Sequence, residues 1–220
     1  MIFPSMTTLL GPNLLAAFQG SEYSLRFELG GETLSNLTQP VPRFLQAFDR
    51  ARAIADAVFP SDGALAGVIG FWELGEFELF HPEAKVGQTG LGELARMGFP
   101  IERPALSWSA IPPFFGEEDG VVWDWNAYDL RGRRDLRDVL LWASVASEMG
   151  IGPKAPVACY LYAPGSDVLM HVYDDRGMDV TALGREPLRP IHLQFNDWVL
   201  EYDRPRIEAV FSKLNDGLTG

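Results

Sequence analysis

The sequence has 220 residues, of which 47% are hydrophobic and 12% aromatic, so the chain can bury a sizeable core and is not a disordered protein. Its 30 acidic and 18 basic residues give a formal net charge of −12. This charge repels phosphate backbones and anionic lipid, so it argues against binding to nucleic acid or to a membrane surface. It suits either solubility or a basic protein partner.

The N-terminal segment MIFPSMTTLLGPNLLAAF has no basic region and is interrupted by Pro4 and by the pair Gly11-Pro12, which is atypical of a signal peptide. No apolar run approaches the roughly 20 residues that span a bilayer. We therefore expect a cytoplasmic protein. The single cysteine, Cys159, permits no internal disulfide, and its apolar neighbours favour a buried, inert thiol over a nucleophile.

Residues 23–31, YSLRFELGG, alternate between apolar and polar side chains, which predicts a half-buried strand ended by two glycines. Arg26 and Glu28 share its polar face. Two interpretations are open for them: an ion pair with each other or across to a neighbouring strand, which we favour, or a pair that faces a ligand.

Further along, helical spacing of apolar residues predicts a short helix at 13–18 and a longer one at 42–59, and residues 64–74 have the composition of a strand. Next, several glutamates surround His81, which suggests metal or acid–base chemistry. Because these glutamates alternate with Phe77 and Leu79, a solvated strand face is the simpler interpretation.

Residues 103–116 carry three prolines and predict an irregular connection, where a weak domain boundary is possible. The segment that follows, 120–130, has strand composition with Trp123 and Trp125 on one face. Exposed, these rings would form a stacking platform; buried, which we favour, they belong to the core.

Residues 130–150 predict the strongest helix of the chain, with Asp135 as its N-cap and Gly150 at its end. Four arginines crowd its start and are candidates for an anion-binding site, because free helix N–H groups point the same way. Neighbouring aspartates favour an internal salt-bridge network instead. The four are Arg131, Arg133, Arg134 and Arg137.

Residues 168–182 predict a β-hairpin whose turn, YDDRG, has Gly177 at a position of positive φ. His171 and Tyr173 share one face of the first strand. A metal site of His171 with a carboxylate of the turn is conceivable, but the sequence has no supporting ligand motif, so we expect no metal and no other cofactor. We expect Arg176 to bind acidic neighbours, including Glu28 and Asp203.

The C-terminal part predicts helical segments at 187–196, 197–202 and 203–214, the last with Asp203 as its N-cap. Strands and helices interleave irregularly, and the strands alternate rather than being uniformly apolar. The sequence therefore predicts an α+β fold, a mainly antiparallel sheet packed with several helices in a single domain.

The segments HVYDDRGMDV and NDWVLEYDR, together with SLRFELGG near the start, resemble the bacterial family known as domain of unknown function 3885. The resemblance touches both ends of the chain and implies no established activity, so it supplies no catalytic residues. It implies a set of patterned polar positions: Arg26, Glu28, Asp174, Asp175, Arg176, Asp179, Asn196, Asp197, Trp198, Asp203 and Arg204.

We expect a non-enzymatic, acidic protein-binding module, in concrete form an immunity-like inhibitor of a basic partner. The alternative is a hydrolase-type enzyme in which carboxylates of the YDDRG turn and of the RFELGG strand act as acid and base in a cleft. The candidate functional surface comprises Arg26, Glu28, His171, Asp174, Asp175, Arg176, Asp179, Trp198, Asp203 and Arg204.

Overall fold

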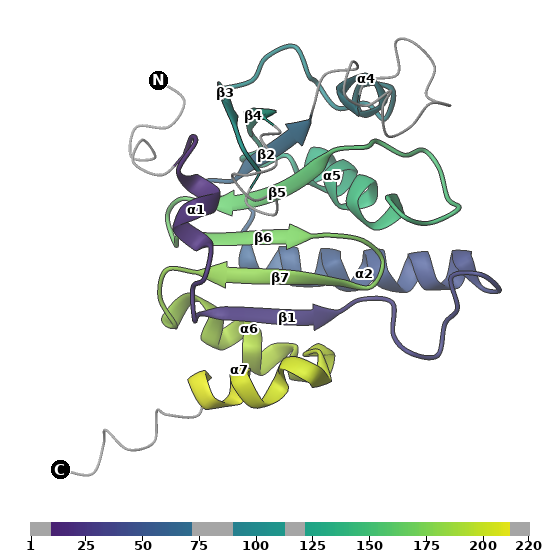
Figure 1. Ribbon diagram of the computed structural model, residues 1–220, viewed down its shortest axis with the longest axis vertical. Coiled ribbons are helices and arrows are strands. Elements are labelled where there is room, and N and C mark those ends of the chain that lie inside the picture. The colour runs from purple at the N-terminus through teal and green to yellow at the C-terminus, as the bar shows by residue number, and fades with distance from the viewer. Residues whose placement is uncertain (1–9, 72–89, 113–121, 212–220) are drawn as a thin grey trace.

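The computed structural model describes residues 10–71, 90–112 and 122–211. Its centre is a seven-stranded sheet in the order β1-β7-β6-β5-β2-β4-β3, in which every pair of neighbouring strands is antiparallel (Figure 1). The strands are β1 (Ser24–Glu28), β2 (Ala66–Phe71), β3 (Leu106–Ala110), β4 (Trp123–Asp129), β5 (Ala158–Ala163), β6 (Val168–Val172) and β7 (Gly177–Ala182).

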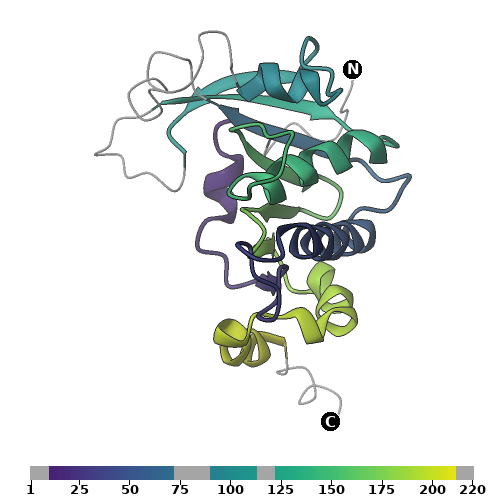
Figure 2. The same cartoon turned by 90° about the vertical axis from the view of Figure 1, so that its right-hand side faces the viewer.

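Helices cover the two faces of the sheet unequally. One face carries the long helices α2 (Pro40–Val58) and α5 (Arg134–Ala146), and the other carries the short helix α1 (Leu14–Phe18) (Figures 1 and 2). The remaining helices are α4 (Gly90–Arg96), α6 (Arg189–Gln194) and α7 (Arg204–Phe211), with single 3-10 turns at Glu186–Leu188, Asn196–Trp198 and Glu201–Asp203.

The main core lies between one face of the sheet and the helices α2 and α5 that cover it. Phe44, Ala51 and Ile54 of α2 pack there against Leu25 and Phe27 of β1, all nearly inaccessible to solvent. The alternation of β1 explains this arrangement, since residues two apart point to the same face of a strand. Arg26 consequently points to the opposite face, where α1 lies.

The outer edge of β1 is closed by the C-terminal segment rather than left open. The backbone N–H of Leu200 donates to the Arg26 carbonyl at 2.9 Å, and Phe27 forms a β-bridge with Val199. Arg50 reaches from α2 to the Glu28 carbonyl at 3.0 Å. An edge whose carbonyls are occupied in this way cannot pair with another strand.

The predicted α+β fold with a mainly antiparallel sheet is confirmed, as is the hairpin of β6 and β7. The predicted cap of α5 is wrong: Arg133 holds that position, and Asp135 lies in the first turn, where it accepts hydrogen bonds from Arg133. Within 103–116, residues 106–110 form β3 of the same sheet. The prediction for His81 and its glutamates falls outside the described residues.

Two predictions about buried side chains are confirmed. Trp123 and Trp125 are 6% and 1% exposed and belong to the smaller core on the α1 face. Cys159 is buried, and burial raises the pKa of its thiol to about 12. Within the described ranges, no helix combines the length and apolarity needed to cross a membrane.

Candidate functional site

The YDDRG turn is a closed network of hydrogen bonds and ion pairs. Asp174 is 2% exposed; it accepts a hydrogen bond from the backbone N–H of Arg176 at 2.7 Å and two more from the Arg176 guanidinium. The same guanidinium reaches Glu148, just beyond α5, at 3.1 Å. The prediction that Arg176 binds acidic neighbours is confirmed, but these are Asp174 and Glu148. The predicted partner Asp203 lies beside Arg26 and Arg206 instead, and no contact between Arg176 and Glu28 is found among the described residues.

Asp175 joins the turn to the start of α2. Its side chain is 4% exposed, and its carboxylate pairs with Nε of Arg43 in α2. Nη1 of Arg43 donates to the carbonyls of Gly31 and Leu34 at 2.8 and 2.7 Å. A Cβ on Gly30 would lie 2.7 Å from the Asp175 carbonyl oxygen, so this close approach requires glycine. The turn thus anchors the β1–α2 loop.

Gly177 is needed for space and not for its backbone angle, contrary to the sequence prediction. It is absent from the glycines with positive φ among the described residues. A Cβ at this position would lie 3.0 Å from the Phe27 carbonyl oxygen of β1 and 3.0 Å from the Tyr173 ring. The glycine therefore lets β1 and the Tyr173 side chain approach the start of β7.

A second cluster of charges lies on the opposite face of the sheet, beside α1. Arg26 and Asp179 are directly opposite each other in β1 and β7, and the guanidinium holds the carboxylate through two hydrogen bonds of 2.8 and 3.1 Å. Asp203 lies 3.1 Å from the third nitrogen of Arg26, and Arg206 lies 3.6 Å from the other oxygen of Asp203. The four side chains alternate in charge.

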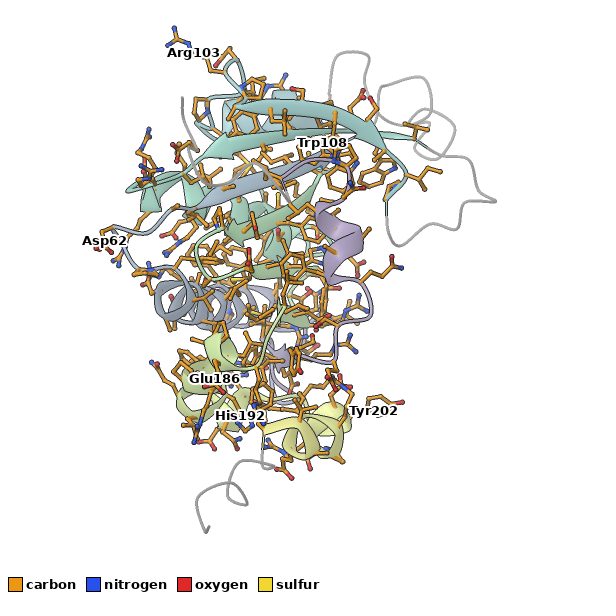
Figure 3. The ribbon with its side chains drawn as sticks, turned by 90° about the vertical axis from the view of Figure 1, so that its left-hand side faces the viewer. Asp62, Arg103, Trp108, Glu186, His192 and Tyr202 are labelled. Carbon is orange, nitrogen blue, oxygen red and sulfur yellow. The ribbon has the colours of Figure 1, made fainter. Side chains whose placement is uncertain are left out.

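This charge cluster borders a cavity of about 470 Å³ between α1 and the sheet. Leu15, Phe18 and Leu169 form its apolar side, and Tyr160 and His171 of neighbouring strands extend it. The hydroxyls of Ser24 and Thr181 lie 3.0 Å apart in its wall. Tyr202 projects into solvent on the same side of the molecule as α1, whereas Glu186 and His192 lie on the other (Figure 3).

His171 is part of a row of aromatic rings that crosses the α1 face of the sheet. The row joins Trp108 to Trp125 at 6.4 Å between ring centroids, Trp125 to Tyr160 at 6.1 Å, Tyr160 to His171 at 4.1 Å, and His171 to Tyr173 at 5.5 Å. Burial lowers the pKa of His171 to about 4, although Asp179 and Asp174 oppose the shift. The imidazole is therefore neutral at pH 7.

Tyr173 ends this row against the charge cluster. Its hydroxyl donates to Asp179 at 3.1 Å, and burial, reinforced by the Asp179 charge, raises the pKa of the phenol. Asp179 thus receives hydrogen bonds from both Arg26 and Tyr173. A carboxylate that is held in this way fixes the orientation of both donors.

The remaining candidates lie elsewhere. Trp198 stacks on Phe195 and lies under the Arg50 guanidinium at 5.2 Å, and Arg204 binds Asn196 and Glu201 beside α7. Three of the four candidate anion-binding arginines have carboxylate partners: Arg133 has Asp135, Arg134 has Asp56, and Arg137 has Asp56 and Asp138. For Arg131 the described contact is a backbone hydrogen bond to Asp129.

The structure therefore divides most of the candidate residues into two groups, which meet at a second cavity of about 390 Å³ lined by both Arg26 and Arg176. Asp174, Asp175 and Arg176 belong to the turn network, whereas Arg26, His171, Asp179 and Asp203 gather at the cavity. Sequence reasoning missed Arg43, Tyr160 and Arg206, which complete the two groups. Local sequence patterns give no signal for them, because an arginine in a helix and a tyrosine in an apolar strand are both ordinary.

A comparison with protein-family models matches residues 9–203 to a family described as domain of unknown function (DUF3885). The chain belongs to this family. The match extends from before α1 to the last residue before α7, so both groups of candidate residues lie inside it, apart from Arg204 and Arg206. No curated protein and no solved structure matches the chain.

Proposed function

We propose that the protein is a non-enzymatic binding module that recognises a basic protein, as an immunity-like inhibitor does. The observation that carries this proposal is a stripe of exposed apolar side chains at the start of α2. Leu37 is 93% exposed, Val41 57% and Leu45 53%. Exposed apolar residues that gather in one place are typical of a surface that a partner covers.

The stripe continues into aromatic side chains. Val41, Leu45 and Phe48 lie four and three residues apart and so share one side of α2, where the half-buried Phe48 packs 5.9 Å from Trp142 of α5. Aromatic rings at the border of an aliphatic patch are the side chains that most often anchor a protein interface. We call residues 37, 41, 45, 48 and 142 the α2 stripe.

The turn network fixes the part of α2 that carries the stripe. Arg43, in the same part of α2, is tied to Asp175 and to the loop that leads into the helix. The β1–α2 loop, the β6–β7 turn and the first turns of α2 lie side by side at the right of Figure 1. A family motif that fixes the start of α2 would hold the stripe rigid before binding, which lowers the entropic cost of association.

Charge supports a basic partner. Most described arginines lie within 4 Å of a carboxylate, including Arg43, Arg52 and Arg176 around the stripe. The net charge of −12 is thus not opposed by a free cationic patch in the described part of the chain. Such a field accelerates the approach of a positively charged protein and weakens with salt.

The hydrolase alternative needed Asp174, Glu28 and Arg26 to converge in one cleft. Arg26 borders the cavity on the α1 face, whereas Asp174 is buried against Arg176 and neither Asp174 nor Glu28 lines a described cavity. Among the described residues the two carboxylates thus share no cavity, which favours the binding proposal over acid–base catalysis.

The test is capture of a partner from a lysate of the native host by the immobilised full chain, at about 0.05 M and about 0.5 M salt. We expect a basic protein to be retained at low salt and released at high salt, and Leu45→Ser to reduce its retention. Leu193→Ser is the matched control, since Leu193 on α6 is 70% exposed but lies outside the stripe. The proposal is wrong if no basic protein is retained, or if both variants bind it equally.

A further inference from the structure

The cavity on the α1 face has a balanced charge pattern that limits what can bind there. Its charged wall is formed by Arg26, Arg206, Asp179 and Asp203, two cations and two anions, and its histidine is neutral. A purely cationic ligand would meet two arginines and a purely anionic ligand would meet two aspartates. A ligand that carries both charges a few ångströms apart avoids both repulsions.

One atom in this wall lacks a hydrogen bond. Asp203 is 9% exposed and lines the cavity, yet its Oδ2 accepts no hydrogen bond from the described residues. Arg26 Nη1 lies 3.1 Å away and balances its charge without donating to it. Because this oxygen is itself inaccessible to solvent, a cationic group in the cavity interacts with the charge of the Asp203 carboxylate as a whole and not through this atom.

The cations of the cluster are accessible to an incoming carboxylate. The Arg206 side chain is 45% exposed; it lies 3.6 Å from Asp203, and its bonds to the Ser24 carbonyl are long, at 3.4 Å. The Arg26 side chain is 41% exposed but is held by Asp179. Arg206 is therefore the arginine with donors to spare for a carboxylate ligand.

The opposite side of the cavity is apolar. Leu15 and Phe18 of α1 face Leu169 of β6 across a volume of about 470 Å³, which is within the range of small-molecule sites. We propose that this cavity binds a free α-amino acid with an apolar side chain. The ammonium group pairs with the Asp203 carboxylate, the carboxylate of the ligand pairs with Arg206, and the side chain packs against the apolar wall.

This inference does not depend on the proposed protein partner, because the α2 stripe and the cavity lie on opposite faces of the sheet. The two proposals have separate tests. A failure to capture a protein partner would not contradict the amino-acid site, and a failure to bind amino acids would not contradict the protein partner.

The test is calorimetric titration of the purified full chain with L-leucine and L-phenylalanine. Each is compared with its methyl ester, which lacks the negative charge, and its N-acetyl form, which lacks the positive charge. We expect saturable binding of at least one free amino acid and an affinity at least tenfold lower for both of its derivatives, since each loses one charged contact.

Variants of the wall locate the site. Arg206→Gln should weaken binding of the free amino acid about tenfold while leaving the affinity for the methyl ester unchanged, whereas Arg189→Gln, on α6 outside the cavity, should change neither. Equal binding of the ester and the free amino acid would show a cation site, and equal binding of the N-acetyl form an anion site. Either result, or no binding of any of these ligands to the wild-type chain, overturns the proposal.

Discussion

Replacing Asp175 with asparagine tests whether the YDDRG turn stabilises the fold. Asp175 and Arg43 are 4% and 13% exposed at their side chains, so the substitution leaves a largely buried guanidinium without its counter-ion. Breaking a buried pair from one side typically costs about 3–5 kcal/mol. Because Arg43 keeps the Gly31 and Leu34 carbonyls as acceptors, we expect the lower end, about 3 kcal/mol.

The assay is equilibrium unfolding in urea, followed by tryptophan fluorescence, with Asp49→Asn as the control. Asp49 also pairs with an arginine of α2, Arg52, but its side chain is 67% exposed, so its removal should cost less than about 1 kcal/mol. Partner capture by the folded Asp175→Asn protein should persist but weaken, because the start of α2 is held less rigidly. A loss of stability no larger than that of the control would refute the architectural role of the turn.

Three further substitutions follow from the described contacts. Gly177→Ala should lower the free energy of unfolding by about 1–3 kcal/mol, because the new methyl group meets the Phe27 carbonyl at 3.0 Å; Gly184→Ala, where a Cβ meets nothing within 4 Å, is the control, and equal effects would contradict the close approach. Since burial lowers the pKa of His171 to about 4 from 6.5, the unfolded chain takes up its proton first as pH falls. The stability that is present above pH 6.5 should thus be lost between about pH 6.5 and 4, by about 3 kcal/mol at most. His171→Gln should reduce this pH dependence in unfolding titrations. The charged and titratable groups near His171, which the variant keeps, are Asp179, Asp174, Arg26 and Tyr173. The Cys159 thiol should react with iodoacetamide at neutral pH only after unfolding, because its pKa is about 12; rapid labelling of the native protein would contradict its burial.

The sequence predicted the fold class because its strands carry their own periodicity. In β1 the alternation of Leu25 and Phe27 with Arg26 places the core on one face, and the turn residues of β6 and β7 indicate a hairpin. Such patterns can be recognised within a short window of the sequence, whatever the distant residues are. The same reasoning places His171 and Tyr173 on one face, as the aromatic row shows.

The pairing of the charged residues could not be predicted in the same way. Arg26 meets Asp179 across 153 residues of chain, and Arg43 meets Asp175 across 132, so each pair depends on which strands become neighbours. Arg43 looks in the sequence like an ordinary solvated residue of a helix. Asp203 directly precedes α7, as predicted for its N-cap, but the ion pairs of its carboxylate with Arg26 and Arg206 could not be predicted, because they depend on the C-terminal segment closing the edge of β1.

The role of glycine was also misjudged from sequence alone. A glycine after a pair of aspartates indicates a turn with positive φ, but Gly177 is the first residue of β7 and is required by the approach of Phe27 and Tyr173. Gly70 plays a similar part in β2, where a Cβ would lie 2.5 Å from the ring of Trp125. Both requirements arise from tertiary contacts and not from the local chain.

The most direct test of the account is the affinity of the captured basic partner for wild-type protein and for Leu45→Ser, measured by calorimetry at low and high salt. We predict that salt weakens binding to both proteins and that the variant binds at least tenfold more weakly, with Leu193→Ser unchanged. An affinity that is independent of salt and unaffected by Leu45→Ser would contradict recognition through the acidic field and the α2 stripe.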